Sequence, residues 1–419
     1  MWAVKTWFLQ PFYWRCDIKM RKKSITLIIL ATAMLSSVLS WNARGIYDIF
    51  DNKDIYSKLH NIQNVLDKEF LYDYDKDKAA DYAALGLTMA LEDPYTVYYT
   101  KKQFEEYTNI GSGDFIGIGV TVVWNKDNNT IEVISVMENS PGMEAGILPG
   151  DTIVAVNDQA YTGTTMNDAV SAIRGTNLGG EIENTTVNVT VERKGKEIDL
   201  TLTRKKIHEN TVSYENMKDG IGYMRITAFN RESQSGESST FDEFKQAYLS
   251  LLDKGMTRLI IDLRDNGGGD LNAVAGIIDS IIPEGILMYS IDKSGHRHEL
   301  TSDKYELNIP IVLLVNGNSA SAAELMTGAL KDYNKATIIG TKTFGKGVMQ
   351  SVFEFPDGSG MTVTIAKYYT PKGICVHEDG ITPDIEIKPL KQYEDTPVSL
   401  IDKKDDVQLQ AAINHLMGK

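Results

Sequence analysis

Two buried-strand patterns constrain the fold of this 419-residue chain more than any other feature. They are Arg258–Leu263 and Ile309–Val315, in which apolar residues follow one another almost without interruption. Each pattern runs directly into a polar, glycine-containing loop and then into a helical pattern. This order of strand, loop and helix is typical of α/β architecture, and such folds place their chemistry on the loops at strand ends.

The amino end differs from the rest of the chain. Residues 1–23 hold six Lys or Arg against one Asp, and residues 24–43 carry no charge. A basic leader before an apolar stretch of this length predicts a signal anchor or a signal peptide, with cleavage after Ser40 as the released alternative. A buried core helix is the competing interpretation. Met20 would make an ordinary start, so residues 1–19 are open to question.

Charge and cysteine content limit the partners and the compartment. The leader carries +5 of a total of −14, which leaves −19 on the remainder. An acidic remainder argues against a nucleic-acid partner, and the positive-inside rule places it outside the cytoplasm, either anchored in the membrane through residues 24–43 or secreted. The two cysteines, Cys16 and Cys375, flank the apolar stretch, and we do not expect them to form a disulfide bond.

The length predicts two or three domains, and composition shifts divide the chain. Residues 46–110 show helical periodicity that Asp93-Pro94 interrupts, and we expect the tyrosines that follow to serve packing. Short β-type runs with one helix at Asn167–Arg174 fill residues 111–204, and the α/β core covers residues 205–390 together with parts of the amino-terminal region. Residues 391–419 form a linker and an amphipathic helix, Asp406–Met417, for which packing on the core and assembly with the amino-terminal helices, as in a homodimer, are alternatives.

The segment Ser140–Asn157 resembles the middle of a PDZ domain, where a small-residue turn and helix lead into a strand. The resemblance implies that the preceding loop binds a chain-terminal carboxylate through backbone N–H groups while a peptide adds a strand to the sheet edge. That loop consists of Phe115, Ile116, Gly117, Ile118 and Gly119. The alternative is that these glycines make only a tight turn.

The loop after the second strand pattern holds a candidate nucleophile, Ser321, in Asn316–Glu324. A hydroxyl at a strand-to-helix turn is well placed for attack, beside helix N–H groups that stabilise negative charge. Ser-x-x-Glu at positions 321 and 324 is also a capping box, so helix capping is the structural alternative. Ser319 is a rival nucleophile that spacing alone does not exclude.

Lys346 is the candidate base, 25 residues after Ser321 and flanked by two glycines. A lysine serves as a base only when burial lowers its pKa from about 10.4 toward neutrality. Most lysines are solvated surface charges, which is the competing interpretation. Gln350, four residues on, cannot titrate, and it either orients the lysine amine or faces solvent.

These segments occur in an order that resembles the carboxyl-terminal processing peptidases, the tail-specific serine proteases of family S41, over residues 48–390. The resemblance implies a crotonase- or ClpP-like α/β protease core, with Ser321 as nucleophile, Lys346 as general base and Gln350 as its orienting partner. It also implies an oxyanion hole formed by the backbone N–H of Ala322 and that of Gly267 or Gly268. Asp265-Asn-Gly-Gly-Gly replaces the family's Asn-Pro-Gly-Gly, and Ala323 replaces a common serine.

Histidine-based and cofactor-based chemistry have little support in the sequence. His377 and Asp379 could form part of a conventional triad, but nothing ties them to Ser321. His296 and His298 lack partners at metal-ligand spacing, and the glycine run at 267–269 lacks the Gly-Lys-Ser/Thr of a phosphate loop. The chemistry implied by the family needs no metal and no cofactor.

The sequence therefore predicts a multidomain α/β endopeptidase that captures carboxyl-terminal tails and cleaves them through an acyl-enzyme. Arg174, at the end of the PDZ-like helix, is a candidate for coupling tail capture to cleavage, with a solvated helix end as the alternative. The rival function from another class is an inactive PDZ scaffold that binds tails. An acyl hydrolase of the crotonase type is a second rival, but it leaves the PDZ-like module without a purpose.

Overall fold

The structure is a computed structural model that describes residues 53–111, 113–137, 139–175, 182–233, 236, 238–394 and 396–419. The described residues fall into two compact units, which divide between Ala83 and Ala84. The predicted leader and the apolar segment 24–43 lie outside the described residues. Among the residues that are described, no helix combines the length and the apolar character needed to cross a membrane.

The helical prediction for the amino-terminal region is confirmed by three helices. These are α2 (Lys53–Glu69), α3 (Lys76–Met89), which crosses the boundary between the two units, and α4 (Lys101–Ile110). A short strand that we did not predict, β1 (Val97–Tyr99), precedes α4 and pairs antiparallel with a strand of the protease core. The segment after Asp93-Pro94 is therefore part of the core.

The β-rich module is an antiparallel sheet in the order β3–β4–β5–β7–β8, with β6 on β5. The predicted helix is α6 (Met166–Arg174), and a one-turn helix, α5 (Pro141–Glu144), begins where the PDZ resemblance begins. Val187, Val189 and Val191 alternate along one strand and are buried, because successive strand residues point to opposite faces. The strands are β3 (Val120–Asn125), β4 (Thr130–Val136), β5 (Thr152–Val156), β6 (Gln159–Ala160), β7 (Thr186–Arg193) and β8 (Lys196–Thr203).

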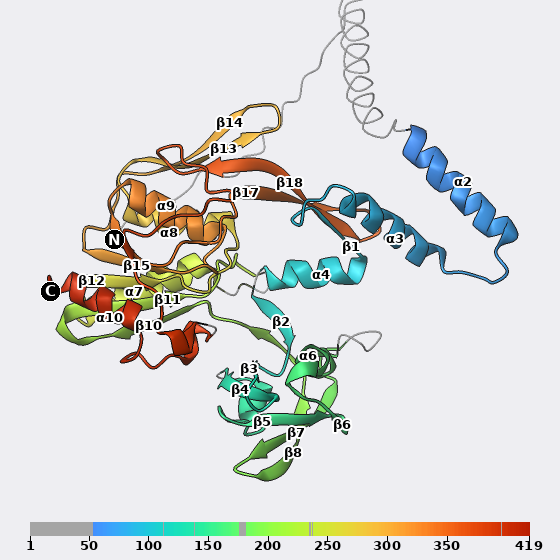
Figure 1. Ribbon diagram of the computed structural model, residues 1–419, viewed down its shortest axis with the longest axis horizontal. Helices are drawn as coiled ribbons and strands as arrows, with labels where there is room; N and C mark the ends of the chain where they lie inside the picture. Colours follow the sequence, from blue (N-terminus) through green and yellow to red (C-terminus); the bar gives the residue numbers. More distant parts are fainter. Residues whose placement is uncertain are drawn as a thin grey trace, which may run out of the picture. The chain divides into compact units, whose positions relative to one another are not determined.

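Two short strands lie where the chain enters and leaves this module. They are β2 (Asp114–Gly117) and β9 (Lys205–His208), which pair antiparallel. Because one strand precedes the module and the other follows it, their pairing closes the module as an insertion between α4 and the core. Figure 1 shows β2 beside the module, between α4 and α6.

The protease core is built on a six-stranded sheet in the order β10–β11–β12–β15–β16–β19. The strands from β11 to β19 run parallel, and β10 is antiparallel to β11. The two strand patterns that open the sequence analysis are β12 and β15, which are neighbours. The bounds are β10 (Val212–Asn216), β11 (Ile221–Ile226), β12 (Arg258–Asp262), β15 (Ile311–Val315), β16 (Ala336–Gly340) and β19 (Ile385–Glu386).

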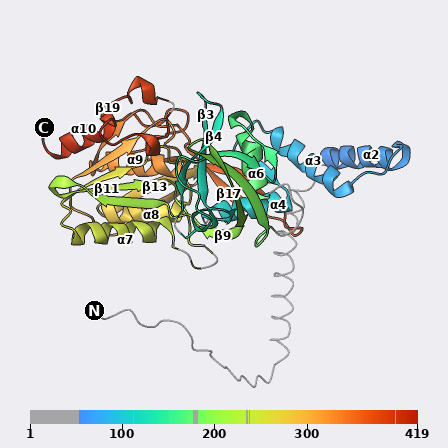
Figure 2. The same cartoon turned by 90° about the horizontal axis from the view of Figure 1, so that it is seen from below.

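Helices cover both faces of this sheet. Leu259 and Ile261 of β12 pack in a core with α7 (Thr240–Asp253), α8 (Leu271–Ile281) and α9 (Ala322–Asp332). Ile260, between them, packs in a second core with α10 (Val407–Leu416). Burial on both faces explains why β12 and β15 read as continuous apolar runs. The predicted carboxyl-terminal helix is confirmed, and Figure 2 shows α10 at the carboxyl end of the chain.

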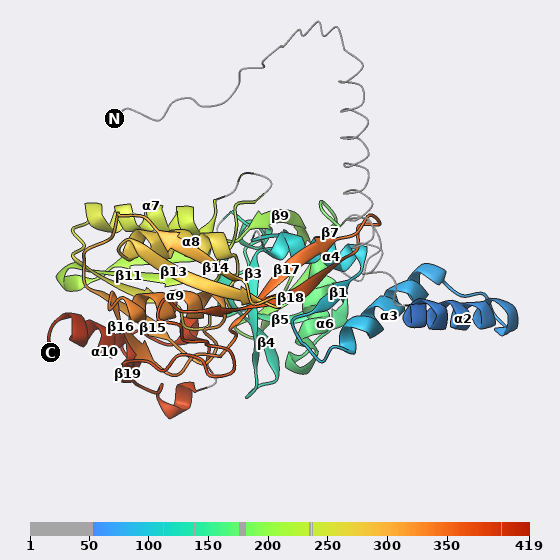
Figure 3. The ribbon, with the colours of Figure 1, turned by 90° about the horizontal axis from the view of Figure 1, so that it is seen from above.

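A second, antiparallel sheet has the order β1–β18–β13–β14, with β17 also paired to β18. Figure 3 shows β17 and β18 as two long adjacent strands. The loop that carries Lys346 leads directly into β17, so this sheet fixes the lysine's position. The strands are β13 (Gly285–Asp292), β14 (Arg297–Ser302), β17 (Val348–Glu354) and β18 (Gly360–Tyr369), and the short 3₁₀ turns are Gly163–Thr165, Lys218–Gly220, Lys391–Tyr393 and Val398–Leu400.

Candidate active site

Ser321 lies at the turn between β15 and α9, with φ 56° and ψ −115°. Few non-glycine residues adopt this backbone conformation, which persists only where the surroundings impose it. Ser321 is also the N-cap residue of α9. The position expected of a nucleophile and the position expected of a helix cap are therefore the same. The sharp strand-to-helix turn is the geometry that presents a nucleophilic hydroxyl at the edge of a sheet.

Ser319, the rival nucleophile, is fully buried. Its hydroxyl donates to the carbonyl oxygen of Leu263 at 2.8 Å and accepts the N–H of Asn316 at 2.9 Å. The first bond fixes the serine loop to the end of β12, and the second closes the loop on itself. Because substrate cannot reach Ser319, its role is to position the loop.

The glycine turn after β12 lies directly against Ser321. A Cβ atom on Gly268 would approach Ser321 Cβ to 2.8 Å and the N atom of Ala322 to 3.0 Å, whereas a Cβ on Gly267 would meet nothing within 4 Å. The Gly268 N–H already donates to Asn266 Oδ1 at 2.8 Å. Within the described residues no hydrogen bond occupies the N–H of Gly267 or Ala322. Of the backbone N–H groups predicted to form an oxyanion hole, those of Gly267 and Ala322 are thus free to donate, whereas that of Gly268 is already bonded.

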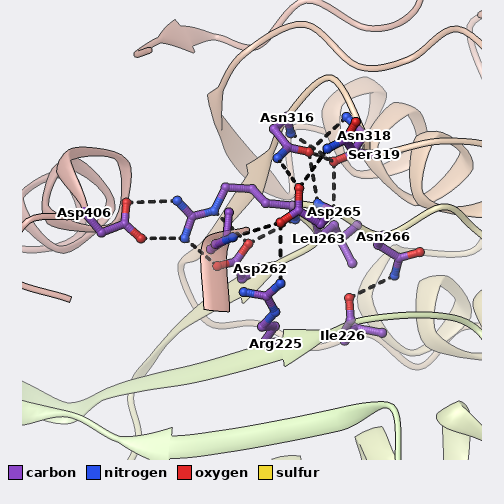
Figure 4. A network of polar contacts seen from close by, with 12 residues as sticks. Arg225, Ile226, Asp262, Leu263, Asp265, Asn266, Asn316, Asn318, Ser319 and Asp406 are labelled. Carbon is purple, nitrogen blue, oxygen red and sulfur yellow. Dashed lines mark hydrogen bonds and ion pairs between the residues drawn. The ribbon is translucent and has the colours of Figure 1, made fainter. Parts of the chain in front are cut away.

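Asp265 ties the glycine turn to two other segments. Its Oδ1 accepts the side-chain amides of Asn316 and Asn318 at 2.8 and 3.0 Å, and its Oδ2 accepts the N–H of Val398 at 3.0 Å. Figure 4 shows Asp265 within this network, with Asn316 and Asn318 beside it. The turn has no proline, and these side-chain bonds supply the rigidity that a proline would otherwise give.

Arg264, one residue earlier, is 1 % exposed and lies between two buried carboxylates. Its guanidinium donates to Asp262 at 2.9 and 2.6 Å and to Asp406 at 2.9 and 2.7 Å. The two carboxylates raise the pKa of Arg264 against the opposing effect of burial, so it remains charged. This pairing anchors the amino end of α10 to the strand that leads into the glycine turn.

Glu324, in the first turn of α9, joins two loops. One is the serine loop, between β15 and α9, and the other is the lysine loop, between β16 and β17, which carries Lys346. Glu324 is fully buried. Its Oε2 accepts the N–H groups of Ser321 and Lys346 at 2.9 and 2.8 Å, and its Oε1 accepts the Thr343 hydroxyl and the Gly345 N–H, both at 2.7 Å. Half of the predicted capping box is thus present, but the same carboxylate also holds a loop more than twenty residues away.

Tyr368 of β18 makes a second link between these loops. Its hydroxyl lies 2.9 Å from the carbonyl oxygen of Ser321 and 2.7 Å from that of Lys346, and its proton is shared between them. Burial raises the pKa of Tyr368 well above its usual value, so the hydroxyl stays a donor. The backbones of the two candidate catalytic residues are therefore fixed relative to one another from two sides.

Lys346 is partly buried, and burial lowers the pKa of its amine, while the charge of Asp93 acts in the opposite direction. The Nζ atom lies 4.5 Å from the centre of the Tyr95 ring. No hydrogen bond among the described residues joins Nζ to Ser321 or to Gln350, and the Gln350 amide donates instead to Thr364 Oγ1 at 3.3 Å. The structure thus brings Ser321 and Lys346 onto adjoining loops without the direct bond that proton transfer needs.

The sequence analysis missed Tyr95, Glu324 as a link between loops, and Tyr368. Tyr95 was expected only to pack, but its ring faces the lysine amine. The one signal for Glu324 was the capping pattern with Ser321. Tyr368 lies in β18 with no motif around it, so only the strand pairing reveals its position.

The segment predicted as the carboxylate loop of the PDZ-like module lines a cavity of about 550 Å³, but Phe115 to Gly117 form part of strand β2 and only Ile118 and Gly119 follow that strand as a loop. Phe115, Gly117, Ile118 and Gly119 line the cavity and Ile116 does not; β3, α6 and three core residues, Thr227, Ala228 and Asn230, complete the lining. Arg174 lies at its edge, with its guanidinium 5.8 Å from the centre of the Phe115 ring. A groove between a PDZ strand and its helix is where a peptide adds to the sheet.

Arg204, which was not predicted from the sequence, holds the carboxyl end of α6 beside Ile173, a residue that lines this cavity. It is fully buried, and its guanidinium donates to the carbonyl oxygens of Ile173 and Ala172 at 2.6 and 2.9 Å. These are the last carbonyls of α6, which lack helical partners, and a cation is favourable at a helix carboxyl end. Arg204 therefore fixes the helix end that carries Arg174.

The histidine alternatives find no support. No hydrogen bond in the described part of the chain joins His377 to Asp379 or to Ser321, and the nearest carboxylate oxygen to His377 belongs to Glu378 at 3.9 Å. His296 and His298 are largely exposed beside Asp292. Within the described residues no group of three or more His, Cys, Asp or Glu side chains is arranged to hold a metal ion.

A strained serine at a strand-to-helix turn, beside two free backbone N–H groups, is the arrangement of a serine hydrolase. The model of peptidase family S41 matches residues 220–387, and a PDZ domain model matches residues 132–183. Together with the alignment of relatives over most of their length, these matches show that the chain belongs to peptidase family S41 and is a serine peptidase. The family and fold class predicted from the sequence are both confirmed.

Relatives in sequence agree with this assignment, and one solved structure shares the fold. The CtpA-like serine protease of Staphylococcus aureus strain N315 is 34 % identical over 384 residues, which cover 88 % of this chain and 73 % of the relative. The Staphylococcus saprophyticus protein of the same name is 34 % identical over 373 residues, covering 87 % and 72 %. A Bacteroides fragilis protein assigned to the S41 proteases shares the fold, with a TM-score of 0.55 and 18 % identity over 78 % of this chain and 87 % of that one. The photosystem II D1 carboxyl-terminal processing protease aligns with 27 % identity and a TM-score of 0.46, covering 79 % and 87 %.

Proposed function

We propose that this serine peptidase is an extracytoplasmic endopeptidase that captures protein carboxyl-terminal tails with its PDZ module and cleaves them with Ser321, Lys346 and Gln350. The observation that carries the proposal is the sharp turn at Ser321 packed against Gly268, while the N–H groups of Gly267 and Ala322, the chain neighbours of Gly268 and Ser321, are free of hydrogen bonds in the described part of the chain. The partly buried Lys346, whose pKa burial lowers, supplies the base on the adjoining loop.

The chemistry follows from these groups. Neutral Lys346 accepts the proton of the Ser321 hydroxyl as Oγ attacks the scissile carbonyl carbon. The N–H groups of Gly267 and Ala322 stabilise the oxyanion. The carbon–nitrogen bond then breaks, the lysine ammonium returns its proton to the leaving amine, and water hydrolyses the ester with the same lysine as base. Gln350 orients the amine when it turns from Thr364 toward Lys346.

Tail capture is supported by the cavity that the 115–119 segment lines in part. Backbone N–H groups of this segment receive the terminal carboxylate, and apolar terminal side chains enter between β3 and α6. Arg174 couples the captured tail to the core from the edge of this cavity. The Arg174→Ala variant should fold normally and lose tail-dependent cleavage, and unchanged tail dependence would remove Arg174 from the account.

The test of the function compares the wild type with Ser321→Ala on one protein substrate that ends in an apolar tail or in the same tail as a carboxamide. We expect the wild type to cleave the free-acid substrate faster than the amide, and Ser321→Ala to bind it without cleavage, as mass spectrometry of the products would show. The matched control is Lys342→Ala, which removes an exposed lysine from the same loop as Lys346. A scaffold that only binds tails predicts the same function in the wild type and in Ser321→Ala.

The location outside the cytoplasm is proposed from the charge pattern of residues 1–43, with either an anchored or a released form. Proteolysis of intact cells should digest the ectodomain of the anchored form from outside. Full protection of the chain in intact cells, with digestion only after lysis, would contradict this location.

A further inference from the structure

The turn that begins at Asp93 is firmly attached to the protease core. Asp93 accepts the N–H of Tyr95 at 3.0 Å and the hydroxyl of Thr96 at 2.6 Å. The Tyr95 carbonyl accepts the hydroxyl of Thr362 in β18 at 2.9 Å, and β1 continues the pairing from Val97. Residues 93–96, here named the Asp93 turn, therefore have a fixed place beside the lysine loop.

This turn presents two groups to the amine of Lys346. The Tyr95 ring centre lies 4.5 Å from Nζ, a distance at which the negative face of an aromatic ring attracts an ammonium ion. The Asp93 carboxylate favours the charged amine through its negative charge. Both effects stabilise the protonated lysine, which is the form that cannot act as a base.

The partner predicted for the lysine is held by the same turn. The Gln350 amide donates to Thr364 Oγ1 at 3.3 Å, and the Thr364 hydroxyl bonds to Asp93. The Thr364 N–H donates to Thr96 Oγ1 at 3.1 Å. The Lys346 amine thus faces the Asp93 turn directly, whereas Gln350 is linked to the turn through Thr364 of β18, and no hydrogen bond among the described residues joins Lys346 to Gln350.

We propose that Tyr95 and Asp93 are positioning residues that hold Lys346 as an ammonium ion over the Tyr95 ring, away from Ser321, until substrate binding releases it. This inference rests on the proposed function, because it concerns the base of the same reaction. Tyr95 lies against the lysine amine, and Asp93 acts on that amine through its charge, so both residues act through Lys346. When the Lys346 amine leaves the Tyr95 ring, the Gln350 amide can leave Thr364 and orient the lysine amine.

Other titratable groups also surround the lysine and bear on its charge. Glu324 bonds only the backbone N–H of Lys346, and Tyr368 bonds only its carbonyl. His377 packs against Gly347 and adjoins Asp93, and the side chain of Glu378 is 87 % exposed to solvent. The Asp93 turn is therefore the element whose side chains act directly on the amine.

Activity requires the neutral amine, so kcat/KM rises with pH through the lysine's pKa in the free enzyme. Loss of the ring face or of the Asp93 charge lowers that pKa, and the rise moves to lower pH. A cation–π contact of ordinary strength corresponds to a shift of about half a pH unit or more, which is roughly a threefold gain in rate on the acidic side.

The test measures kcat/KM against pH for the wild type, Tyr95→Leu, Tyr95→Phe and Asp93→Asn in the full chain, with a tail-bearing protein substrate. We expect the acidic limb to move down by about half a unit or more in Tyr95→Leu and Asp93→Asn and to stay in place in Tyr95→Phe, which keeps the ring. An acidic limb at the wild-type pH in both Tyr95→Leu and Asp93→Asn would overturn the proposal.

Two additions keep the test decisive. If Tyr95→Leu does not fold, trifluorophenylalanine at position 95 keeps the ring's shape while weakening its negative face, and it should shift the limb in the same direction. An unshifted limb with this residue would also overturn the proposal. Ser321→Ala is measured in the same assay: full activity there means that the proposed function has failed, whereas lost activity with an unshifted limb in the turn variants means that only this inference has failed.

Discussion

Glu324 and Lys346 are joined by a hydrogen bond of 2.8 Å from the lysine's backbone N–H to Oε2 of the glutamate. The same oxygen accepts the N–H of Ser321. One buried carboxylate therefore sets the distance between the backbones of the two residues proposed to carry out the reaction. Its contribution is to geometry, because its side chain contacts neither the serine hydroxyl nor the lysine amine.

Replacement of Glu324 should damage both stability and cleavage. Glu324→Ala leaves four buried donors without their acceptor, and each unsatisfied buried donor costs about 1–3 kcal/mol. We expect a loss of at least about 3 kcal/mol in the free energy of unfolding by denaturant, together with loss of cleavage. Glu324→Gln keeps one acceptor oxygen, so its free energy of unfolding and its cleavage rate should lie between those of Glu324→Ala and the wild type. Glu378→Gln, at an exposed glutamate, is the control and should match the wild type.

Lys346→Arg should abolish cleavage although it preserves the positive charge. Arginine stays protonated at any pH the enzyme tolerates, so it cannot accept the Ser321 proton. Removal of a general base costs about 10²- to 10⁴-fold in rate. Because burial lowers the pKa of Lys346, the wild-type rate should rise with pH and level off below the ordinary lysine range. Rate measurements from acidic to alkaline pH test this, and an active arginine variant would contradict it.

The glycine turn offers a matched pair of substitutions. Gly268→Ala should displace the serine loop and reduce cleavage strongly, because its φ of 104° disfavours a side chain and its Cβ would lie 2.8 Å from Ser321 Cβ and from the Ala320 carbonyl. Gly267→Ala meets no neighbouring atom within 4 Å and should leave the unfolding midpoint unchanged. Equal unfolding midpoints and rates for the two variants would show that the turn is not packed against the serine as described.

Asp406→Ala should destabilise the core by uncoupling α10 from β12. It leaves the buried Arg264 with one carboxylate instead of two, and removal of one partner from a buried ion pair costs about 3–5 kcal/mol. Chemical denaturation measures this loss. Asp402→Asn, at an exposed position four residues earlier, is the control and should change stability little. Similar stability in both variants would mean that the carboxyl-terminal segment is not anchored through Arg264.

The sequence predicted the parts of the fold that depend on local pattern. Strands β12 and β15 were recognisable because both of their faces are buried, which leaves a continuous apolar run. The helix α6 and the PDZ-like turn at Ser140 followed from periodicity and a motif. Strand β1 was missed because three residues carry no period, and its pairing with β18 depends on residues about 260 positions away.

The sequence predicted which residues form the candidate site, but it did not predict how these residues contact one another. The order and spacing of motifs indicated Ser321 and Lys346, and these residues do lie on adjoining loops. Sequence spacing could not relate Tyr95 to Lys346, which is 251 residues away, because no periodicity operates over that distance. The burial of Arg204 could not be predicted either, because arginine is seldom fully buried. The partners of Arg204 are mostly backbone carbonyls, which have no signal in the sequence.

The central claim is that Ser321 is the nucleophile and Lys346 its base. Its most direct test treats the wild type, Lys346→Ala and Ser321→Ala with a fluorophosphonate, followed by peptide mapping of the covalent adduct. The account predicts one adduct, on Ser321, that forms in the wild type, is lost in Ser321→Ala and is strongly slowed in Lys346→Ala. An adduct on another serine, or equal labelling of Ser321 in the wild type and Lys346→Ala, would contradict it.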